Sequence, residues 1–600
     1  MAAGEGDLIE HPTEYRDCVP SPDGASVAWV SDRSGRPRAW VAPLPVDGSA
    51  ITEPARPVGP DTDVAALSWS PDGEWIALQL APGGGEHTRV VLVRPDGSGC
   101  ADIAPAAPAV TLGSWAAVGY RLGVTILGED GEGQACLVDV RDGTSTLLAS
   151  GPAARVCATS VDGRRAVVRL GRRGDRGLEL VDLRSGLRIP LLPGDGATIA
   201  DARFDRDRLY VHTDAGRDRP ALLAVDSRGR SATRVVAARD DADLDSVALD
   251  PEAARVVLVW NADGRSELEL LDLRSGLATP LPVPPGDVVT AVAFTRDGRG
   301  LLVGSTGPAV PPRVSFLPLW PGGAPWPLLA SPAVDAVAPD LLRFRGEDGL
   351  PLTGWLFRPR GAVGPVPVLL WLHGGPEAQE RPVHQPLFQA LAAAGIAVFA
   401  PNVRGSAGYG RAFAGADDGP RRRVAITDVR AAVAHLVDSG HADPDRVGVA
   451  GRSYGGYLTL VALAWFPELF AVGVDVCGMA DLHTFYRDTE PWIATAATGK
   501  YGDPVADAAL LDELSPLHRA DRITAPLLVV HGANDTNVPL GEAEQIVAAL
   551  RERGRSPGFL LFEGEGHEVA GTANRAEFVA EVVRWVSGPL LGVDAASRAG

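Results

Sequence analysis

The chain has 600 residues, a length that one hydrophobic core does not organise, so at least two domains are expected. Hydrophobic residues make up 45% of it, as in globular proteins, and no apolar run approaches the roughly 18 residues that a membrane-spanning helix needs. The formal net charge of −20 argues against binding to nucleic acids or to anionic membranes.

Cysteine usage predicts a reducing environment. The five cysteines are odd in number and scattered without paired spacing, which argues against a disulfide framework. No metal-ligand cluster and no cofactor motif is visible, so neither a metal nor a cofactor is expected. The N-terminus lacks the basic start and apolar stretch of a signal peptide. We therefore predict a cytoplasmic protein, and leave its oligomeric state open, a homo-oligomer included.

A short β-rich unit recurs through the first half of the chain. In each unit a turn with an aspartate precedes an apolar strand, and the marker aspartates are Asp23, Asp72, Asp162, Asp207, Asp250 and Asp297. They lie roughly 45 residues apart, except that the gap between Asp72 and Asp162 is twice as long. We therefore expect one more unit in that gap, with a degenerate form of the marker turn near residue 117. This period, with about four short strands per unit, is typical of propeller blades. The sequence therefore predicts an all-β, seven-bladed β-propeller.

The repeats end near residue 335, and strands of another kind follow. We expect a short N-terminal extension over residues 1–14, the propeller over 15–335 and a second domain over 336–600. Residues 366–372 form an apolar strand, directly followed by His373-Gly374-Gly375-Pro376. Glycines at such a position let the backbone approach a ligand closely.

The most informative motif of the second domain is Gly451-Arg452-Ser453-Tyr454-Gly455. It fits the G-x-S-x-G pattern, in which a serine stands on a tight turn between a strand and a helix. Residues 445–450 before it are typical of a buried strand, and residues 457–463 after it of a packed helix. The pattern predicts an α/β-hydrolase domain with a doubly wound, mostly parallel sheet and Ser453 as its nucleophile.

A serine hydroxyl needs a base beside it, and in this fold the acid and the histidine follow the serine in that order. Asp535 follows the apolar strand 526–532, and His567 follows the apolar strand 559–562. Active-site residues lie at the carboxyl ends of parallel strands. We therefore predict that His567 accepts and returns the Ser453 proton while Asp535 orients the imidazole.

Other residues near these positions are weaker candidates. Asp512 and Asp521 precede the strand and would lie at its wrong end. His531 lies within the strand, and Asn534 carries no charge. Asp535 and His567 remain the best partners for Ser453.

Acyl transfer also needs hydrogen-bond donors for the oxyanion of the tetrahedral intermediate. One donor is expected to be the backbone N–H of Tyr454, directly after the nucleophile. The second is expected from the Gly-Gly turn after strand 366–372. That turn follows a strand upstream of the nucleophile, as the fold requires.

These motifs, with Asn402–Gly410 and Asn534–Pro539, resemble those of the prolyl oligopeptidase family of serine peptidases, particularly its acylaminoacyl-peptidase and dipeptidyl-aminopeptidase branch. The resemblance covers most of residues 341–590. It implies that the second oxyanion donor is the backbone N–H of Gly375. It also implies that the propeller covers the active site and admits only short peptides or small molecules. His373 stands in the region where prolyl oligopeptidases proper use a tyrosine, which argues against strict proline specificity.

We expect the substrate-binding residues mainly in the segment that follows the predicted strand 471–476 along the chain. The candidates are Phe485, Tyr486, Trp492, Tyr457 and Arg404. The first three are expected in a polar loop, where they form either an apolar side-chain pocket or a packed lid. Arg404 is either a residue of the site or a structural ion-pair residue.

The predicted function is hydrolysis of short peptides or aminoacyl amides through an acyl-enzyme, as an aminopeptidase or an acylaminoacyl-peptidase. A small-molecule amidase or esterase, for example one that cleaves an aminoacyl amide of an antibiotic, is the alternative on the same scaffold. A propeller binding scaffold with a silent hydrolase domain is a third hypothesis, which the intact set of Ser453, Asp535 and His567 argues against.

Overall fold

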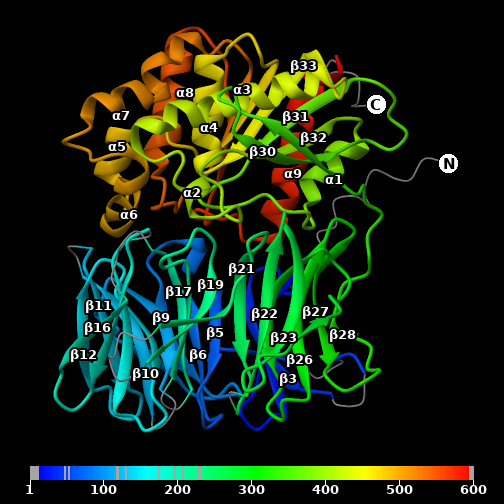
Figure 1. Cartoon of the computed structure of the whole chain (residues 1–600). Helices are drawn as coiled ribbons and strands as arrows, with labels where there is room; N and C mark the ends of the chain where they lie inside the picture. Colours follow the sequence, from blue (N-terminus) through cyan, green and yellow to red (C-terminus); the bar gives the residue numbers. More distant parts are fainter. Residues whose placement is uncertain are drawn as a thin grey trace.

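The computed structural model describes residues 12–592 except 46–48, 52–54, 117–119, 129–130, 173, 193–196, 206–207, 227–232 and 253. Two parts are stacked on one another: a ring of β-sheets from the first half of the chain, and a helix-flanked sheet from the second (Figure 1). Residues 1–11 of the expected N-terminal extension, the marker Asp207 and the degenerate marker near residue 117 lie outside the described residues.

Seven four-stranded antiparallel sheets form the ring, and in each the strands pair in sequence order. The first four blades are β1 (Tyr15–Pro20), β2 (Ser26–Ser31), β3 (Arg38–Pro43), β4 (Arg56–Val58); β5 (Val64–Trp69), β6 (Ile76–Leu80), β7 (Arg89–Val93), β8 (Cys100–Ile103); β9 (Ala109–Trp115), β10 (Arg121–Leu127), β11 (Gly133–Asp139), β12 (Ser145–Gly151); and β13 (Arg155–Thr159), β14 (Arg165–Leu170), β15 (Gly177–Asp182), β16 (Arg188–Leu192). The last three are β17 (Ile199–Asp205), β18 (Arg208–Thr213), β19 (Ala221–Asp226), β20 (Thr233–Ala237); β21 (Asp243–Leu249), β22 (Arg255–Ala262), β23 (Arg265–Asp272), β24 (Ala278–Leu281); and β25 (Val288–Phe294), β26 (Gly300–Gly307), β27 (Val310–Pro318), β28 (Trp326–Leu329).

The turn that marks each repeat is held by its own side chains. In the second blade the Ser70 hydroxyl donates to Asp72, and Asp72 accepts the backbone N–H of Glu74 at 3.0 Å. Gly73 takes a φ of 73°, a left-handed conformation that glycine adopts at little cost. The repeated turn therefore fixes the register between the first two strands of a blade.

Hydrophobic clusters between neighbouring blades hold the ring together. One cluster closes it, because Trp29 of the first blade and Phe316 of the last blade belong to the same buried core. Burial of apolar surface between blades is the main stabilising contribution that such an architecture has. The structure confirms the seven-bladed propeller that the repeat predicts.

The second part is an eight-stranded sheet in the order β29-β30-β32-β31-β33-β34-β35-β36. Its strands are β29 (Asp340–Arg345), β30 (Pro351–Phe357), β31 (Val366–Leu372), β32 (Ala397–Asn402), β33 (Ala442–Arg452), β34 (Val472–Val476), β35 (Leu527–Gly532) and β36 (Gly558–Phe562). The pairs β29–β30 and β30–β32 are antiparallel, and the remaining pairs are parallel. The mostly parallel α/β sheet expected from the motifs is thereby confirmed.

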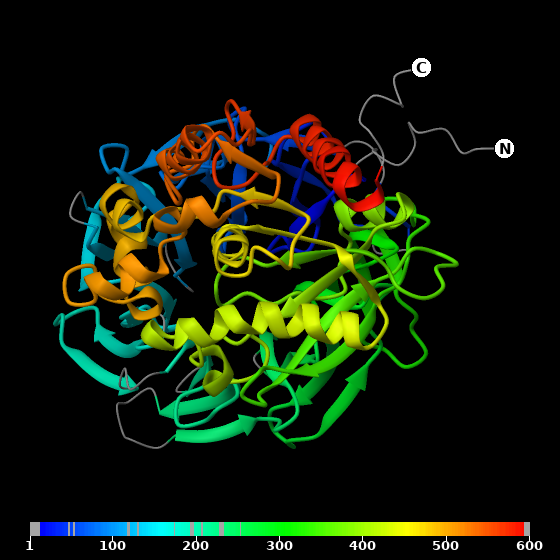
Figure 2. The ribbon, with the colours of Figure 1, turned by 90° about the horizontal axis from the view of Figure 1, so that it is seen from above.

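Helices cover both faces of this sheet (Figure 2). The helices of the α/β part are α1 (Pro386–Ala393), α2 (Arg411–Ala414), α3 (Arg422–Asp438), α4 (Tyr454–Trp465), α5 (Leu482–Asp488), α6 (Pro491–Tyr501), α7 (Ala508–Leu514), α8 (Leu540–Glu552) and α9 (Thr572–Leu591), with the short 3-10 turns η2 (Gly419–Arg421) and η3 (Pro516–Arg522). Another such turn, η1 (Pro82–Gly84), lies in the propeller between β6 and β7. Helices α1 and α9 share one core with the sheet, and α3, α4 and α8 share the other. A parallel sheet covered on both faces explains the continuous apolar runs of its strands.

The last propeller strand ends at Leu329 and the first strand of the second sheet begins at Asp340. The domain division at residue 335 stays a prediction within that interval.

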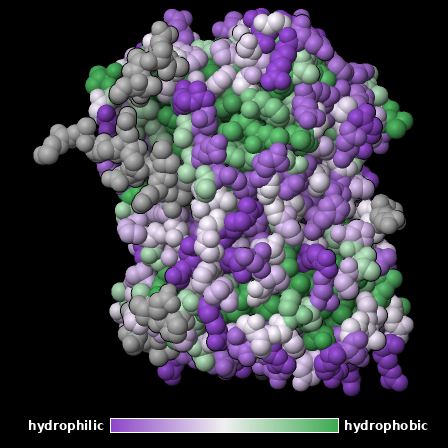
Figure 3. Space-filling model, turned by 180° about the vertical axis from the view of Figure 1, so that it is seen from behind, coloured by the Kyte–Doolittle hydropathy of each residue, from purple (hydrophilic) through white to green (hydrophobic). Residues whose placement is uncertain are grey.

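All five cysteines lie among the described residues and are free thiols. Among the described residues, no helix combines the length and the apolar character needed to cross a lipid bilayer. Figure 3 shows a mostly mixed surface on one face, with the largest hydrophobic area on the α/β part.

Candidate active site

Ser453 lies at the sharp turn between β33 and α4. Its φ of 57° is left-handed, an unfavourable conformation for a non-glycine residue and the one that the G-x-S-x-G turn imposes. The glycines beside it are sterically required. A Cβ at Gly455 would lie 1.8 Å from the carbonyl oxygen of Leu372, and one at Gly451 would lie 2.4 Å from the carbonyl oxygen of Gly455.

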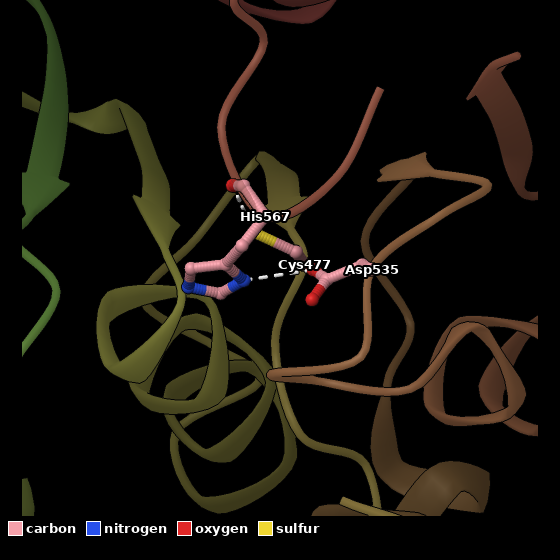
Figure 4. Close-up of side chains that lie close together, drawn as sticks. All are labelled: Cys477, Asp535 and His567. Carbon is pink, nitrogen blue, oxygen red and sulfur yellow. Dashed lines mark hydrogen bonds and ion pairs between the residues drawn. The ribbon is translucent and has the colours of Figure 1, made fainter. Parts of the chain in front are cut away.

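Asp535 and His567 meet at the carboxyl ends of two adjacent strands, β35 and β36. The two side chains are hydrogen bonded, with 2.7 Å between His567 Nδ1 and Asp535 Oδ2 (Figure 4). The other carboxylate oxygen of Asp535 accepts the backbone N–H groups of Asn537 and Val538, each at 2.9 Å. The carboxylate is thereby fixed, and the proton between the pair resides on Nδ1, which leaves Nε2 free as a base.

The surroundings of His567 favour its protonated form. Burial works against the imidazolium charge, but the neighbouring Cys477 sulfur and the Asp535 carboxylate more than offset it, so the pKa of His567 is raised above its usual value. A raised pKa strengthens the imidazole as a proton acceptor.

The loop that carries His567 is fastened to the serine turn. The Arg452 guanidinium, one residue before Ser453, donates to the backbone carbonyl of His567 at 2.7 Å. The same guanidinium pairs with Glu568 at 3.4 Å. The backbone N–H of Ser453 donates to the carbonyl of Val476, on the neighbouring strand β34, at 2.8 Å. The structure therefore brings the turn of the predicted nucleophile and the predicted base together; their catalytic roles stay a prediction.

The segments that carry the predicted oxyanion donors lie next to the serine. Tyr454 is the first residue of α4, so its N–H is one of the four that have no acceptor within the helix. A Cβ at Gly374 would lie 3.3 Å from the Cβ of Ser453, which places the Gly-Gly turn against the nucleophile. His373, which precedes that turn, is anchored by contacts of 2.8 Å to the Ser406 hydroxyl and 2.7 Å to the Gly374 carbonyl.

Ser453 and Gly375 line a cavity of about 810 Å³ between the propeller and the α/β domain. Its larger apolar lining residues are Met479, Phe485, Trp492, Ile493, Tyr501 and Val538. Its charged lining residues are Arg172, Asp175, Asp214, Asp243, Glu377, Arg411, Asp418 and Lys500. The apolar set comes from the α/β domain, and the propeller supplies acidic groups opposite it.

Two of the predicted substrate-binding residues line this cavity, but not from a loop. Phe485 lies on α5 and Trp492 on α6. The prediction of a polar loop is therefore wrong. Asp481 caps α5 by accepting the N–H of His483, and Pro491 starts α6 with its fixed φ, so capping outweighs the polar composition.

The other three candidates point elsewhere. Tyr457 is fully buried and its hydroxyl donates to the carbonyl of Leu514 at 3.0 Å. The Tyr486 hydroxyl donates to the carbonyl of Gly502 at 2.8 Å.

Arg404 is buried and does not line the cavity. Its guanidinium pairs with Asp428 at 2.8 Å and with Asp348 at 2.7 Å. The two carboxylates together accept hydrogen bonds from all three guanidinium nitrogens. These contacts favour the structural ion-pair alternative for this residue.

Sequence reasoning missed several residues of the site. Tyr501 and Lys500 enter the cavity from the end of α6, and Lys500 pairs with Glu377 at 2.8 Å and Asp418 at 2.7 Å. Nothing in their local pattern marks them, because the packing of Tyr501 against Tyr454 of α4 and Phe485 of α5 brings the end of α6 to the cavity.

Cys477 was likewise not expected at the site. It follows β34, the strand next to β35, and its sulfur, one carboxylate oxygen of Asp535 and one ring nitrogen of His567 lie within 4.8 Å of one another (Figure 4). The sequence shows no metal-ligand spacing, yet three adjacent strand ends bring three metal-ligating groups together.

Comparison with known proteins finds similarity to peptidases. Residues 384–590 match the family model described as "Prolyl oligopeptidase family". Dipeptidyl aminopeptidase BIII of Pseudoxanthomonas mexicana is 31% identical over 411 residues, which cover 62% of this chain and 57% of that protein. The acylamino-acid-releasing enzyme of Sus scrofa is 25% identical over 359 residues, 56% of this chain and 48% of that enzyme. The alignments thus span less than two thirds of the length of these relatives.

Solved structures match over nearly the whole chain. A prolyl endopeptidase, from a study of two such enzymes and their inter-domain dynamics, superposes with a TM-score of 0.85 at 17% identity, covering 97% of this chain and 90% of the other. A puromycin hydrolase superposes with a TM-score of 0.83 at 20% identity, covering 99% and 97%. At these identities the likeness shows a shared fold.

Proposed function

The chain belongs to the prolyl oligopeptidase family of serine peptidases, and from this premise we propose that it hydrolyses short peptides or aminoacyl amides through an acyl-enzyme on Ser453. The observation that carries the proposal is the hydrogen-bonded pair of Asp535 and His567, on a loop that Arg452 fastens to the serine turn. Such a pair beside a strained serine is the arrangement that acyl transfer requires.

In the proposed reaction the Ser453 hydroxyl attacks the substrate carbonyl while His567 Nε2 takes its proton. Asp535 keeps the Nδ1 proton in place and stabilises the imidazolium that forms. The imidazolium then gives its proton to the leaving amine, so that the amide bond breaks and the acyl-enzyme remains. Water, activated by the same imidazole, releases the acid and restores the serine.

The oxyanion would be held by the backbone N–H groups of Tyr454 and Gly375. The first lies at the N-terminus of α4, where the helix dipole also favours negative charge. The second belongs to the turn that packs against Ser453. Loss of one donor of this kind costs roughly a hundredfold or more in turnover.

The cavity favours a substrate with an apolar side chain and a free amine. Phe485, Tyr501 and Val538 offer an apolar wall on the side of the serine. Five carboxylates stand among the described charged residues of the lining against three cations, and Arg219, outside the lining, pairs with one of the five, Asp243, at 2.5 Å. The remaining excess of one negative charge favours a cationic group. We therefore favour release of unblocked N-terminal residues over release of acylated ones.

A small-molecule amidase is the second candidate, favoured by the size of the cavity. A volume of about 810 Å³ lies within the range typical of small-molecule sites. The similar fold of a puromycin hydrolase makes puromycin, an aminoacyl amide with a free amine, the appropriate substrate to assay.

A substrate panel tests the proposal. Aminoacyl anilides, the same anilides with an acetylated amine, puromycin and simple esters are compared by kcat/KM, with Ser453→Ala as the blank. We expect the free aminoacyl anilides to be cleaved at least tenfold faster than the acetylated ones. Equal or faster cleavage of the acetylated anilides would reverse the preference, and no cleavage of any amide would refute the peptidase assignment.

A further inference from the structure

We propose that Cys477, Asp535 and His567 form a binding site for a thiophilic divalent cation, Zn²⁺ in particular, and that the bound ion holds the hydrolase inactive. Binding is independent of the proposed function, whereas the inhibition rests on it. Thiolate, imidazole and carboxylate are the three ligand types that zinc takes in proteins.

The geometry comes from three adjacent strands of one sheet. Cys477 follows β34, Asp535 follows β35 and His567 follows β36, and these strands pair in parallel. The three donor atoms already lie within 4.8 Å of one another, and the closest two, on Asp535 and His567, are 2.7 Å apart. Donor atoms around a tetrahedral zinc ion are about 3.3–3.6 Å apart, so shifts on the order of 1 Å complete the site.

The backbone holds the cysteine at this position. Cys477 has a φ of 42°, and its N–H donates to the carbonyl of Val530 on the next strand at 2.9 Å. Its sulfur lies 3.9 Å from the backbone carbonyl of His567. The thiol is therefore fixed against the catalytic pair rather than free to rotate away with a mobile loop.

The charges of the site match a divalent ion. A Cys477 thiolate and the Asp535 carboxylate supply two negative charges, and a neutral His567 supplies none. The Arg452 guanidinium lies beside the cluster, where it donates to the His567 carbonyl at 2.7 Å, and Glu568 offsets its charge at 3.4 Å. A buried divalent ion would thus be compensated, as burial requires.

A second cavity borders the cluster. It has a volume of about 420 Å³ and is lined by Cys477, His567 and His531, whereas Ser453 lines the larger cavity. His531 is 1% exposed, and its Nδ1 has no hydrogen-bond partner among the described residues, while its Nε2 contacts the carbonyl of Val538 at 2.8 Å. An unpartnered buried acceptor at this wall is suited to hold a water molecule that completes the shell of the ion.

The bound ion would act on turnover rather than on substrate binding. An ion ligated by His567 and Asp535 takes the place of the proton between them, so the imidazole no longer accepts the Ser453 proton with the required orientation. The substrate cavity is untouched. We therefore expect kcat to fall at a nearly constant KM.

Binding is measured first, without any activity assay. Zn²⁺ is titrated into the full-length protein against a chromogenic chelator, and Co²⁺ is added to a separate sample to look for a thiolate-to-cobalt absorption band. We expect one Cys477-dependent site in the wild type. Cys477→Ser and Cys477→Ala should lose the band and weaken binding at least tenfold, while Cys100→Ala, which removes an exposed thiol on the propeller, should retain both.

Inhibition is measured next, each variant relative to its own metal-free rate. At a Zn²⁺ concentration that lowers wild-type kcat tenfold, the Cys477 variants should lose less than twofold, and a chelator should restore the wild type. Binding that survives both Cys477 substitutions would overturn the proposed site. Cys477-dependent binding in a protein that cleaves no substrate would instead keep the site and refute the proposed function.

Discussion

The hydrogen bond between Asp535 and His567 is the contact on which the chemistry depends, because it fixes both the tautomer and the direction of the imidazole. We expect His567→Ala to lower kcat by roughly 10³-fold or more, since members of such a triad act as a unit. Steady-state kinetics and thermal melting measure the two effects, and the fold should be retained. The control is His518→Ala, which removes a half-exposed histidine outside the site. Turnover of His567→Ala within tenfold of the wild type would exclude His567 from the mechanism.

A substitution at Gly455 tests whether the serine turn requires glycine for steric reasons. A Cβ at this position would overlap the carbonyl oxygen of Leu372 at 1.8 Å, and backbone cannot yield as a flexible side chain does. We expect Gly455→Ala to lower the free energy of unfolding by about 2 kcal/mol or more, together with a loss of Ser453 labelling. Denaturant unfolding gives the first quantity. Gly541→Ala is the matched control, because a Cβ there meets open space on α8; equal stability of the two variants would contradict the steric argument.

The buried carboxyl of Glu380 makes the stability of the protein depend on pH. Burial raises the pKa of this carboxyl from 4.5 to about 8. The folded state therefore keeps a proton that the unfolded chain gives up above pH 4.5, so stability falls as the pH rises from about 5 to 8. We expect Glu380→Gln to reduce that fall in the free energy of unfolding by about 1–3 kcal/mol. Urea unfolding of both proteins at pH 5 and pH 8.5 measures it, and parallel pH profiles would contradict the burial effect.

Ser453, Asp535 and His567 could be named from the sequence because each follows an apolar strand in the order that the fold requires. Cys477 could not, since its closeness to the pair arises from the adjacency of β34, β35 and β36 and leaves no spacing along the chain. For Arg404 the sequence left two alternatives open. A charged residue near a motif is as well suited to a buried ion pair as to a ligand, and its contacts with Asp348 and Asp428 favour the former.

The loop after β36 is the element that determines whether the site is assembled. Arg452 holds it from the α/β side, and on the propeller side Arg36 pairs with both Asp63 at 2.6 Å and Glu565 at 3.3 Å. Glu565 is fully buried and accepts the N–H groups of Ala570 and Gly571, so it anchors both ends of the loop. The propeller therefore contributes directly to the position of His567.

We expect Arg36→Ala to lower kcat about 5- to 30-fold with little change in KM, the effect of losing 1–2 kcal/mol of loop positioning. Arg36→Lys should restore part of the loss. The control is Arg38→Ala, which removes an ion pair with Asp61 inside the propeller. A kcat for Arg36→Ala equal to that of the control would show that the loop is positioned without the propeller.

Strands were easier to predict than the helices around the cavity. The apolar runs that become β31 and β35 are largely buried in a sheet covered on both faces, so their pattern is unambiguous. The run that becomes β36 lies at the edge of the sheet and is half-buried except for Phe562. The segment of Phe485 and Trp492 was wrongly predicted as a loop because its helices are short and depend on caps rather than on an apolar stripe.

In the whole molecule the propeller and the α/β domain both line the cavity that holds Ser453. Acidic residues of the blades form the wall of the cavity opposite the apolar residues of α5 and α6. The repeat period was enough to predict the ring, because seven units close a propeller. The contacts across the interface could not be read from either half alone, since they join residues hundreds of positions apart, as Asn537 and Glu86 show at 2.9 Å.

We expect the propeller to select substrates by length. A series of peptides with the same N-terminal residues, from three to thirty residues long, should show kcat/KM falling at least tenfold beyond roughly ten residues, because the propeller supplies one wall of the cavity that holds Ser453. The measurement is cleavage followed by mass spectrometry. A constant kcat/KM across the series would contradict a propeller that restricts access.

The most direct measurement is covalent labelling of the folded protein by a fluorophosphonate, with the modified residue located by peptide mass spectrometry. One label per chain on Ser453, absent in Ser453→Ala and at least a hundredfold slower in His567→Ala, is expected if the serine, the imidazole and the carboxylate work together. An unlabelled wild type, or the same labelling rate without the imidazole, would contradict it.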